Sequence, residues 1–247
     1  MKMSRRAWHA MAASLLLVGT AWGQQLESTP RPAGEAPPQS YLGKTVVDFR
    51  QLLAGPPAVD SILDQADRRA IDEFQRVDEP RWHVAEADDR LVYPRFEDAF
   101  GRRIDRQNTP ALVALLNRAI RDVSATTFAA KGQFSRPRPF QRMQLERVCD
   151  EAAPPKAEAH PTSGSSYPSG HSAYGWAVAM ILARVARDRA PALMTRAAEY
   201  AESRLVCGVH FPSDIYAGQT VAAAVVSRLD ASPEFRSDLD RARAEIK

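Results

Sequence analysis

One stretch of this chain is apolar on almost every side of a helix. The segment Ala173–Val185, which follows Gly170, is rich in alanine and carries a charge only at Arg184. A helix that is hydrophobic all round belongs in the interior of a protein and not at its surface. The segment therefore predicts a buried helix with other elements packed around it.

Several further segments carry apolar residues at helical spacing. Thr109-Pro110 is a strong helix start, because an N-cap residue type is followed by proline at the first helical position. The predicted helices run from 61 to 74, from 109 through 123, from 192 to 205, from Ser213 or Asp214 to Leu229, and from 233 to 246. Residues 78–108 are predicted to be irregular and charged, with four aromatic anchors: Trp82, Tyr93, Phe96 and Phe100.

The pattern favours helices throughout the chain. No segment shows sustained alternation of apolar and polar residues, and the dipeptides typical of β-hairpin turns are absent from the sequence. We therefore expect an all-α fold, a single-domain helical bundle. In the helix over 61–74 the predicted apolar face consists of Ile62, Leu63, Ala66, Ala70, Ile71 and Phe74.

Residues 1–23 have the pattern of a signal peptide. Lys2, Arg5 and Arg6 precede an uncharged stretch over 10–23 that is shorter than the ~20 residues needed to span a bilayer. Small residues at Ala21 and Gly23 suit cleavage after Gly23, and Ser4-Arg5-Arg6 also resembles a twin-arginine signal, so the export route stays open. The alternative interpretation is an amphipathic or buried N-terminal helix.

The predicted domain organisation follows from composition. Residues 24–40 contain Pro30, Pro32, Pro37 and Pro38 and few large apolar residues, which indicates a flexible, proline-rich leader. Residues 41–247 form the expected single globular domain. No segment after residue 23 is apolar over a membrane-spanning length.

Charge and cysteine content narrow the partners and the compartment. The chain has 33 basic and 30 acidic residues, and Lys2, Arg5 and Arg6 account for that excess. The remainder has no block of basic residues, which argues against nucleic acid as a partner. In an oxidising compartment Cys149 and Cys207 are expected to form one disulfide, and two free buried thiols are the alternative.

Two histidines stand in contexts that suit anion chemistry. Pro168-Ser169-Gly170-His171 lies directly before the predicted buried helix, where free backbone N–H groups and the helix dipole attract an anion. Ser169 adds a hydroxyl donor, Gly170 allows close backbone approach, and His171 would point at the bound anion.

The second histidine has a carboxylate four residues away. Asp214 could accept a proton from one nitrogen of His210, which leaves the other nitrogen free to act as a nucleophile. Arg204 precedes this pair, and Lys131 with Arg136-Pro137-Arg138-Pro139 supplies further cations. Alone, each motif is compatible with a surface turn, a loop before a helix or a local hydrogen bond. Together they suit phosphoryl transfer.

In this order the motifs resemble the signature of the phosphatidic acid phosphatase type 2 superfamily. They are Lys131-x6-Arg138-Pro139, Pro168-Ser169-Gly170-His171 and Ser203-Arg204-x5-His210-x3-Asp214. Residues 167–176 and 203–210 are similar to the bacterial class A non-specific acid phosphatases, and the similarity runs from about Leu52 to Ile246.

The resemblance implies an exported, periplasmic, all-helical acid phosphatase that needs neither metal nor cofactor. Its substrates would be small phosphate monoesters of broad range, hydrolysed through a phosphohistidine, with phosphotransferase side activity left open. His210 corresponds to the nucleophile, Asp214 to the residue that orients it, and His171 to the general acid. The residues corresponding to the phosphate-binding set are Lys131, Arg138, Ser169, Gly170 and Arg204.

Three other functions share part of this pattern. A vanadium-dependent haloperoxidase has the same signature, because vanadate mimics phosphate. An integral-membrane lipid phosphatase would need spanning helices, and a non-catalytic phosphate-binding protein would have no use for two such histidines. His83 and His160 match no motif and are interpreted as surface or structural residues. The sequence leaves the physiological substrate and a homo-oligomeric state open.

Overall fold

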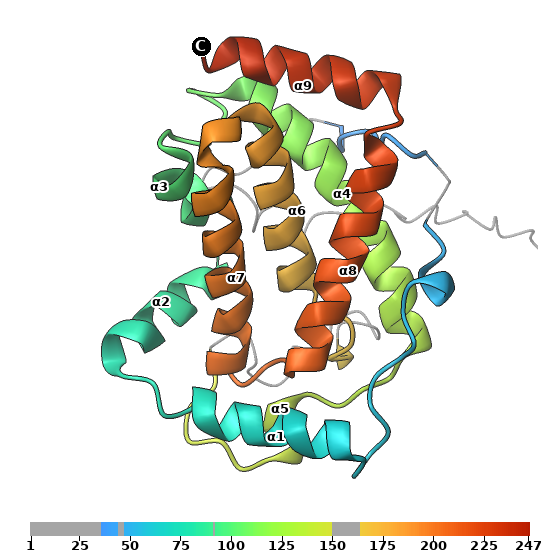
Figure 1. The fold of residues 1–247 in the computed structure, drawn as a ribbon, viewed down its shortest axis with the longest axis vertical. Coiled ribbons are helices and arrows are strands. Elements are labelled where there is room, and N and C mark those ends of the chain that lie inside the picture. The colour runs from blue at the N-terminus through green and yellow to red at the C-terminus, as the bar shows by residue number, and fades with distance from the viewer. Residues whose placement is uncertain (1–35, 44–46, 91, 150–163) are drawn as a thin grey trace, which may run out of the picture.

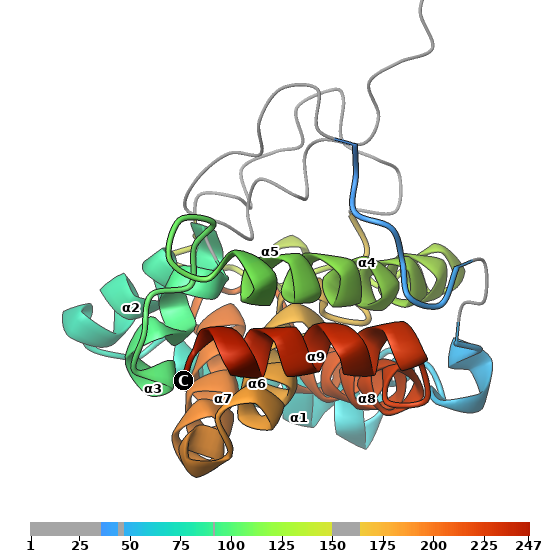
Figure 2. The same ribbon diagram turned by 90° about the horizontal axis from the view of Figure 1, so that it is seen from above.

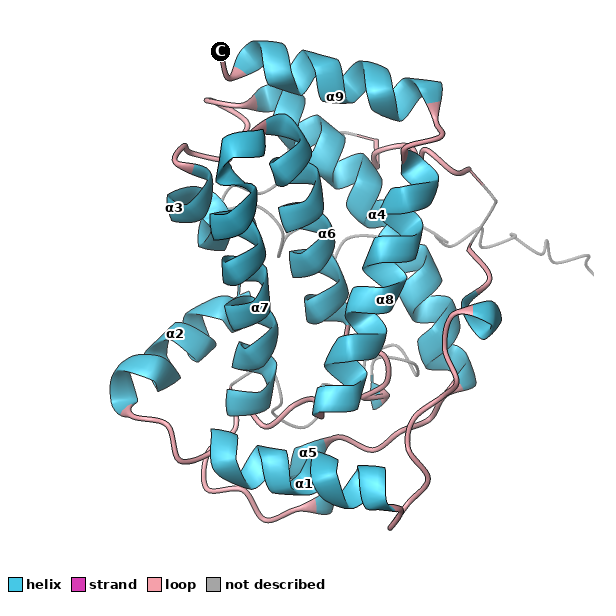
Figure 3. Cartoon of the chain, in the orientation of Figure 1, coloured by secondary structure: helices cyan, strands magenta, loops and turns pink. Residues whose placement is uncertain are grey.

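The computed structural model describes residues 36–43, 47–90, 92–149 and 164–247. The predicted signal peptide, most of the predicted leader and His160 lie outside the described residues. Within these ranges the chain is helical and contains no strand, as Figure 3 shows, so the predicted all-α fold is confirmed. The α-helices are α1 (Ile62–Phe74), α2 (Glu79–Arg90), α3 (Glu97–Phe100), α4 (Pro110–Gln133), α5 (Pro139–Arg142), α6 (Gly170–Val185), α7 (Ala190–Val206), α8 (Pro212–Leu229) and α9 (Pro233–Glu245).

Helix α6 lies at the centre of the bundle. It packs against α4, α7, α8 and α9, and Ala173, Ala177 and Val178 are fully buried. Figure 1 shows α7, α6 and α8 side by side, with α9 across one end and α1 with α5 across the other. In the view from above, α4 lies in a second layer against α6 and α8 (Figure 2). The predicted buried helix is therefore confirmed, and it runs between the two ends of the bundle.

Two glycines let α6 approach its neighbours closely. A Cβ atom on Gly175 would lie 2.4 Å from Cδ1 of Tyr200 in α7. A Cβ atom on Gly218 in α8 would lie 2.4 Å from the carbonyl oxygen of Ser169, the N-cap of α6. Since real side chains do not fit at such distances, these glycines set the spacing between the three helices.

The start of α4 is satisfied by a distant residue. Thr109 is the N-cap and Pro110 the first helical residue, as predicted, but the Thr109 side chain makes no capping hydrogen bond. Instead, the carboxylate of Glu245 in α9 accepts from the backbone N–H groups of Ala111 and Leu112, at 2.8 and 3.0 Å. These donors have no partner within α4, so the contact joins α9 to the end of the longest helix.

The prediction that residues 78–108 are irregular is wrong. This segment contains α2, the 3₁₀ turn Tyr93–Phe96 and α3. Its four aromatic anchors are buried as expected. Apolar spacing did not reveal α2 because its inner face carries Asp88 and Asp89, which are buried against arginines of α7.

The helix over 61–74 is confirmed, but part of its predicted apolar face is wrong. Ile62 and Leu63 are 81% and 67% exposed, whereas Asp64 and Asp67 are buried. The two carboxylates point inward because they form ion pairs there, Asp67 with Arg136 and Asp64 with Arg142. The N-cap predicted at Ser213 or Asp214 is also wrong, since α8 begins at Pro212 with Phe211 as its N-cap.

A disulfide joins Cys149 to Cys207, as expected, and so links the loop after α5 to the end of α7. Beside it, Gly208 adopts a left-handed conformation with φ of 68°, which turns the chain sharply toward His210. At the other end of the chain, Ser40 hydrogen-bonds the carboxylate of Asp122 in α4 at 2.5 Å. In the described ranges no helix is both long and apolar enough to cross a bilayer.

Candidate active site

The predicted site residues come from several separate parts of the chain and meet where α6 begins. Lys131 lies in the last turn of α4, and Arg138 is the N-cap of the short helix α5. Arg204 lies in the last turn of α7, whereas Asp214 lies in the first turn of α8. Ser169 caps α6, and Gly170 and His171 are its first residues. Helix ends thus supply most of the polar groups, and the loop after α7 adds His210.

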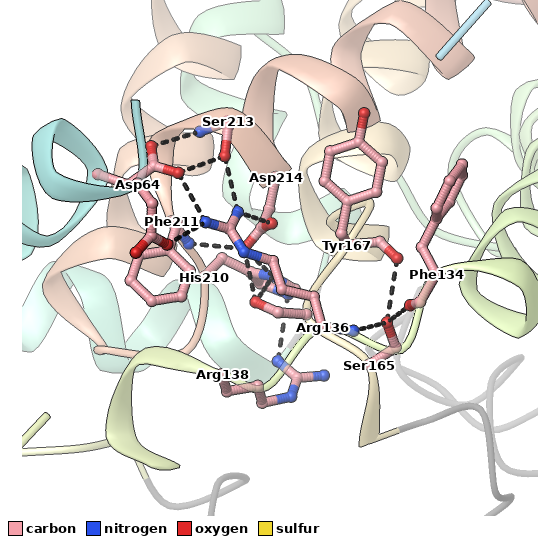
Figure 4. Close-up of polar contacts among 12 residues, drawn as sticks. Asp64, Phe134, Arg136, Arg138, Ser165, Tyr167, His210, Phe211, Ser213 and Asp214 are labelled. Atoms are coloured by element: carbon pink, nitrogen blue, oxygen red, sulfur yellow. Dashed lines mark hydrogen bonds and ion pairs between the residues drawn. The ribbon is translucent and has the colours of Figure 1, made fainter. Parts of the chain in front are cut away.

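His210 is buried, and its two ring nitrogens face different partners. Nε2 lies 3.3 Å from Nη1 of Arg138 (Figure 4). A guanidinium nitrogen can only donate, so Nε2 acts as the acceptor and its lone pair faces the cationic side of the site. The ring proton then sits on Nδ1, which lies 3.4 Å from Oγ of Ser166 and 3.6 Å from Oδ2 of Asp214.

Asp214 is fully buried and accepts from three donors. These are Oγ of Ser166 at 2.5 Å, the backbone N–H of Phe211 at 2.7 Å and Nη1 of Arg136 at 2.6 Å. The pair expected from the spacing of four is therefore present, but the distance from Nδ1 to the carboxylate exceeds hydrogen-bond length. Ser166 bonds the carboxylate and faces the imidazole. Sequence reasoning missed Ser166, which stands just before the predicted motif.

Arg136 holds this carboxylate in place from the side away from His210. Besides Asp214, its guanidinium contacts Asp67 of α1 at 2.8 Å and Oγ of Ser213 at 2.7 Å, and it stacks 4.2 Å from the ring centre of Phe211. The two arginines of the motif Arg136-Pro137-Arg138-Pro139 therefore have different partners. Arg138 faces His210, whereas Arg136 is committed to structural carboxylates (Figure 4). Nothing in the sequence marked Asp67 as the partner.

His210 is buried among positively charged side chains. Lys131 is buried, donates to the carbonyl oxygen of Ser165 at 2.6 Å, and has a pKa lowered to about 7 by burial and by the charge of Arg138. Burial and the charges of Arg138, Lys131 and Arg204 lower the pKa of His210 well below its usual value. A neutral imidazole surrounded by cations can bind an anion and then attack it.

His171 has a different environment from His210. The ring is half-buried, and Nε2 lies 3.2 Å from the backbone carbonyl oxygen of Asp89 in α2. The Asp89 carboxylate pairs with Arg204 instead. Burial and the nearby charge of Arg204 lower the pKa of His171 to about 3. Asp89 is thus a further residue that sequence reasoning missed, because it lies in the segment predicted to be irregular.

The sequence predicts the Ser169 hydroxyl only as a donor to an anion, but in the structure this hydroxyl also caps α6. Ser169 and Gly170 are buried, and the Ser169 hydroxyl accepts from the backbone N–H of Ser172 at 3.3 Å as a helix cap. The hydroxyl retains its own proton for an anion. The Ser169 N–H donates to the carbonyl oxygen of Asp214, which fixes the start of α6 to that of α8.

The remaining expectations concern metals and the unassigned histidines. Across residues 36–43, 47–90, 92–149 and 164–247 no group of three histidine, cysteine or carboxylate side chains is placed to hold a metal ion. His83 is exposed on α2 and pairs with Glu86 at 3.1 Å. Its interpretation as a surface residue agrees with this position.

A family model and several curated proteins are similar to this chain. A family model for the PAP2 superfamily matches residues 110–230. An acid phosphatase from Zymomonas mobilis is 32% identical over 200 residues, covering 79% of this chain and 74% of the relative. Non-specific acid phosphatases from Providencia stuartii and Salmonella typhimurium are 32% and 31% identical over 206 residues, covering 81% of this chain and 81% and 80% of each relative.

Proposed function

The chain belongs to the PAP2 superfamily, and from that premise we propose that it is an exported acid phosphatase. Its substrates would be small phosphate monoesters, taken with broad specificity, and its reaction would pass through a phosphohistidine on His210. The observation that carries the proposal is the acceptor state of Nε2 in His210, which faces Arg138 while Nδ1 faces Ser166 and Asp214.

In the first step, Nε2 of His210 attacks phosphorus. The N–P bond forms as the bond to the leaving oxygen breaks, and the positive charge that develops on the ring is stabilised by the carboxylate of Asp214. The leaving alcohol receives a proton from His171. In the second step, water gives its proton back to His171 and attacks phosphorus, which breaks the N–P bond and releases phosphate. Attack by another alcohol in place of water would give phosphotransferase activity.

The phosphate group would be held by the cations and backbone donors around His210. Lys131, Arg138 and Arg204 provide charge, and the hydroxyl of Ser169 and the N–H groups at the start of α6 provide further donors. The Nε atom of Arg204 supports this assignment, because it is buried and has no hydrogen-bond partner among the described residues. Such a donor is costly unless a ligand satisfies it.

The electrostatics explain how such an enzyme would work in acid. A nucleophilic imidazole must be neutral, and the lowered pKa of His210 keeps it neutral well below pH 6.5. His171 is also neutral in the free protein, because its pKa is about 3. A bound phosphate dianion opposes the charge of Arg204 and raises that pKa, so His171 would gain its proton when the substrate binds.

The proposal needs no metal ion or cofactor, because lysine and arginine side chains supply the positive charge. Export rests on the pattern of residues 1–23, and the disulfide between Cys149 and Cys207 supports it, since such bonds persist in oxidising compartments. N-terminal sequencing of the secreted protein should find Gln24 as the first residue.

The test is hydrolysis of p-nitrophenyl phosphate between pH 4 and pH 8, with and without EDTA. We expect turnover that is unaffected by chelation and is inhibited competitively by vanadate. A second arm adds vanadate, peroxide and bromide. Loss of turnover in EDTA with recovery on adding a divalent metal would refute the proposed chemistry, and halide oxidation in the second arm would favour the haloperoxidase alternative.

A further inference from the structure

A polar cavity lies at the far end of the bundle from His210. Its volume is about 770 Å³. It is bordered by the end of α6, the 3₁₀ turn Arg187–Arg189 before α7, the turn after α3 and the last residues of the chain. Helix α6 begins at the candidate active site and ends here, and its 16 residues span about 24 Å. Figure 1 shows this end of the bundle beneath the C-terminal end of α9.

The cavity is strongly basic although the sequence has no block of basic residues. Six of its lining residues are cations: Arg102, Arg184, Arg187, Arg189, Arg243 and Lys247. Only one acidic side chain, Asp188, stands among the described residues that line it. The fold therefore brings together cations from three separate stretches of the chain, a feature that inspection for local charge runs could not reveal.

Two of these cations are already neutralised. Arg184 makes a two-pronged pair with Asp230, at 2.7 and 3.0 Å, and Arg243 pairs with Asp240 at 2.9 Å. Both stand in the last turns of their helices, where a positive charge compensates the negative end of the helix dipole. Because these ion pairs offset their charges, Arg184 and Arg243 contribute little surplus positive charge to the cavity.

The other cations supply the surplus. Arg102, Arg187 and Lys247 are exposed and form no ion pair with any residue that the structure describes. Arg189 lies 3.7 Å from Asp188, a weak contact. The Arg189 guanidinium packs against Gly101, where an added Cβ would lie 3.1 Å from Nη2. Gly101 has φ of 79° and ends α3, so glycine serves both the turn and the placement of this arginine.

We propose that this cavity binds a small molecule carrying two or more phosphate groups. Its volume lies in the range of small-molecule sites, roughly 300–1,000 Å³. Guanidinium groups match phosphate oxygens with paired hydrogen bonds. Arg102, Arg187, Arg189 and Lys247, less the charge of Asp188, leave a surplus of about three, which two phosphate groups of about −1.5 to −2 charges each would offset. The N-terminal end of α7, which has no side-chain cap, adds its dipole.

The test measures binding of methylenebisphosphonate, whose P–C–P bridge a phosphatase cannot hydrolyse, by isothermal titration calorimetry. The wild-type chain should bind at two places, the candidate active site and this cavity. The double variant Arg102→Glu/Arg187→Glu should lose the second, with affinity reduced about 100-fold, because each lost charged hydrogen bond costs roughly tenfold. Arg121→Glu, a reversal on an exposed residue of α4, is the matched control and should leave both.

Two further measurements separate this site from the proposed function. Turnover of p-nitrophenyl phosphate should be unchanged in the double variant, which also shows that it folds, and Arg138→Ala should weaken only the binding at the active site. Unchanged binding in the double variant, or loss of all binding in Arg138→Ala, would overturn the proposal. So would binding to phosphatidylglycerol vesicles that depends on Arg102 and Arg187 when the soluble bisphosphonate does not bind.

Discussion

The two histidines of the candidate active site are supported in different ways. His210 has the carboxylate of Asp214 3.6 Å from Nδ1, with the Ser166 hydroxyl bonded to the same carboxylate. Nε2 of His171 lies beside the backbone carbonyl of Asp89, whose carboxylate pairs with Arg204, and the ring stacks with Tyr200. Each histidine thus stands near one buried aspartate, but only His210 has a ring nitrogen in contact with the carboxylate itself.

This difference indicates which imidazole the site would stabilise as a cation. Phosphorylation of His210 makes its ring positive, and the negative charge of Asp214 is already in place to stabilise it. Near His171 the charge of Asp89 is offset by Arg204, and burial together with Arg204 keeps this imidazole neutral until a phosphate anion binds. The predictions below test this distinction, from the largest expected effect to the smallest.

Removing the nucleophile should have the largest effect. In His210→Ala we expect turnover of p-nitrophenyl phosphate to fall by about 10⁴-fold or more, since no other group can take the phosphoryl group. Binding of inorganic phosphate, measured by calorimetry, should largely survive because Lys131, Arg138 and Arg204 remain. His83→Ala, at an exposed position on the same protein, is the control and should keep full turnover.

Removing the acid should have an effect that depends on the leaving group. For a sugar phosphate, His171→Ala should reduce kcat by about 10²–10⁴-fold, the usual contribution of general acid catalysis. For p-nitrophenyl phosphate the loss should be much smaller, because that leaving group departs without a proton. Steady-state kinetics on both substrates decide the matter, and equal losses would remove His171 from this role.

Breaking the network behind His210 should cost stability as well as rate. Arg136→Ala leaves Asp214 and Asp67 buried without their cation, which should lower the free energy of unfolding by about 3–5 kcal/mol. Arg76→Ala is the matched control, because Arg76 pairs with Glu73 at the exposed surface of α1 and its removal strands no buried carboxylate. Urea denaturation of both variants compares them, and similar losses would show that Arg136 has no special place.

The smallest expected effect, for each histidine and each pH unit, is on the pH dependence of stability. The pKa values of His171 and His210 are lower in the folded protein than their usual 6.5, so the unfolded chain binds more protons in acid. Stability should therefore be complete above pH 6.5 and fall as the pH drops, by at most about 1.4 kcal/mol per pH unit for each histidine. Inorganic phosphate should reduce this slope.

Urea titrations from pH 7 to pH 4.5 measure that slope. His171→Asn should show a shallower slope than the wild-type chain, whereas His83→Asn should leave the slope unchanged. A slope that stays the same in His171→Asn would mean that this imidazole is not held neutral by its surroundings.

The sequence predicted the parts of the fold that rest on apolar burial. The all-round apolar pattern placed α6, and the Thr109-Pro110 start placed α4. The segments that it predicted wrongly, α2 and the inner face of α1, bury carboxylates instead. Asp88, Asp89, Asp64 and Asp67 look like surface residues in sequence, and ion pairs with arginines outside their own helices make their burial favourable.

The candidate site shows the same division. The motif residues lie at helix ends that a local pattern can reveal, and they gather as the motifs indicate. Ser166 and Arg136, which hold Asp214, act through contacts across 48 and 78 residues of sequence. Such contacts depend on how segments far apart in the chain pack together, so no local spacing predicts them.

The central claim is that His210, and not His171, carries the phosphoryl group. The most direct test is to mix the protein with ³²P-labelled p-nitrophenyl phosphate, quench in alkali and locate the label by peptide mass spectrometry. We predict an alkali-stable, acid-labile label on His210 in the wild-type chain, a stronger one in His171→Ala, where hydrolysis is slowed, and none in His210→Ala. A label on His171, or one that persists in His210→Ala, would contradict the account.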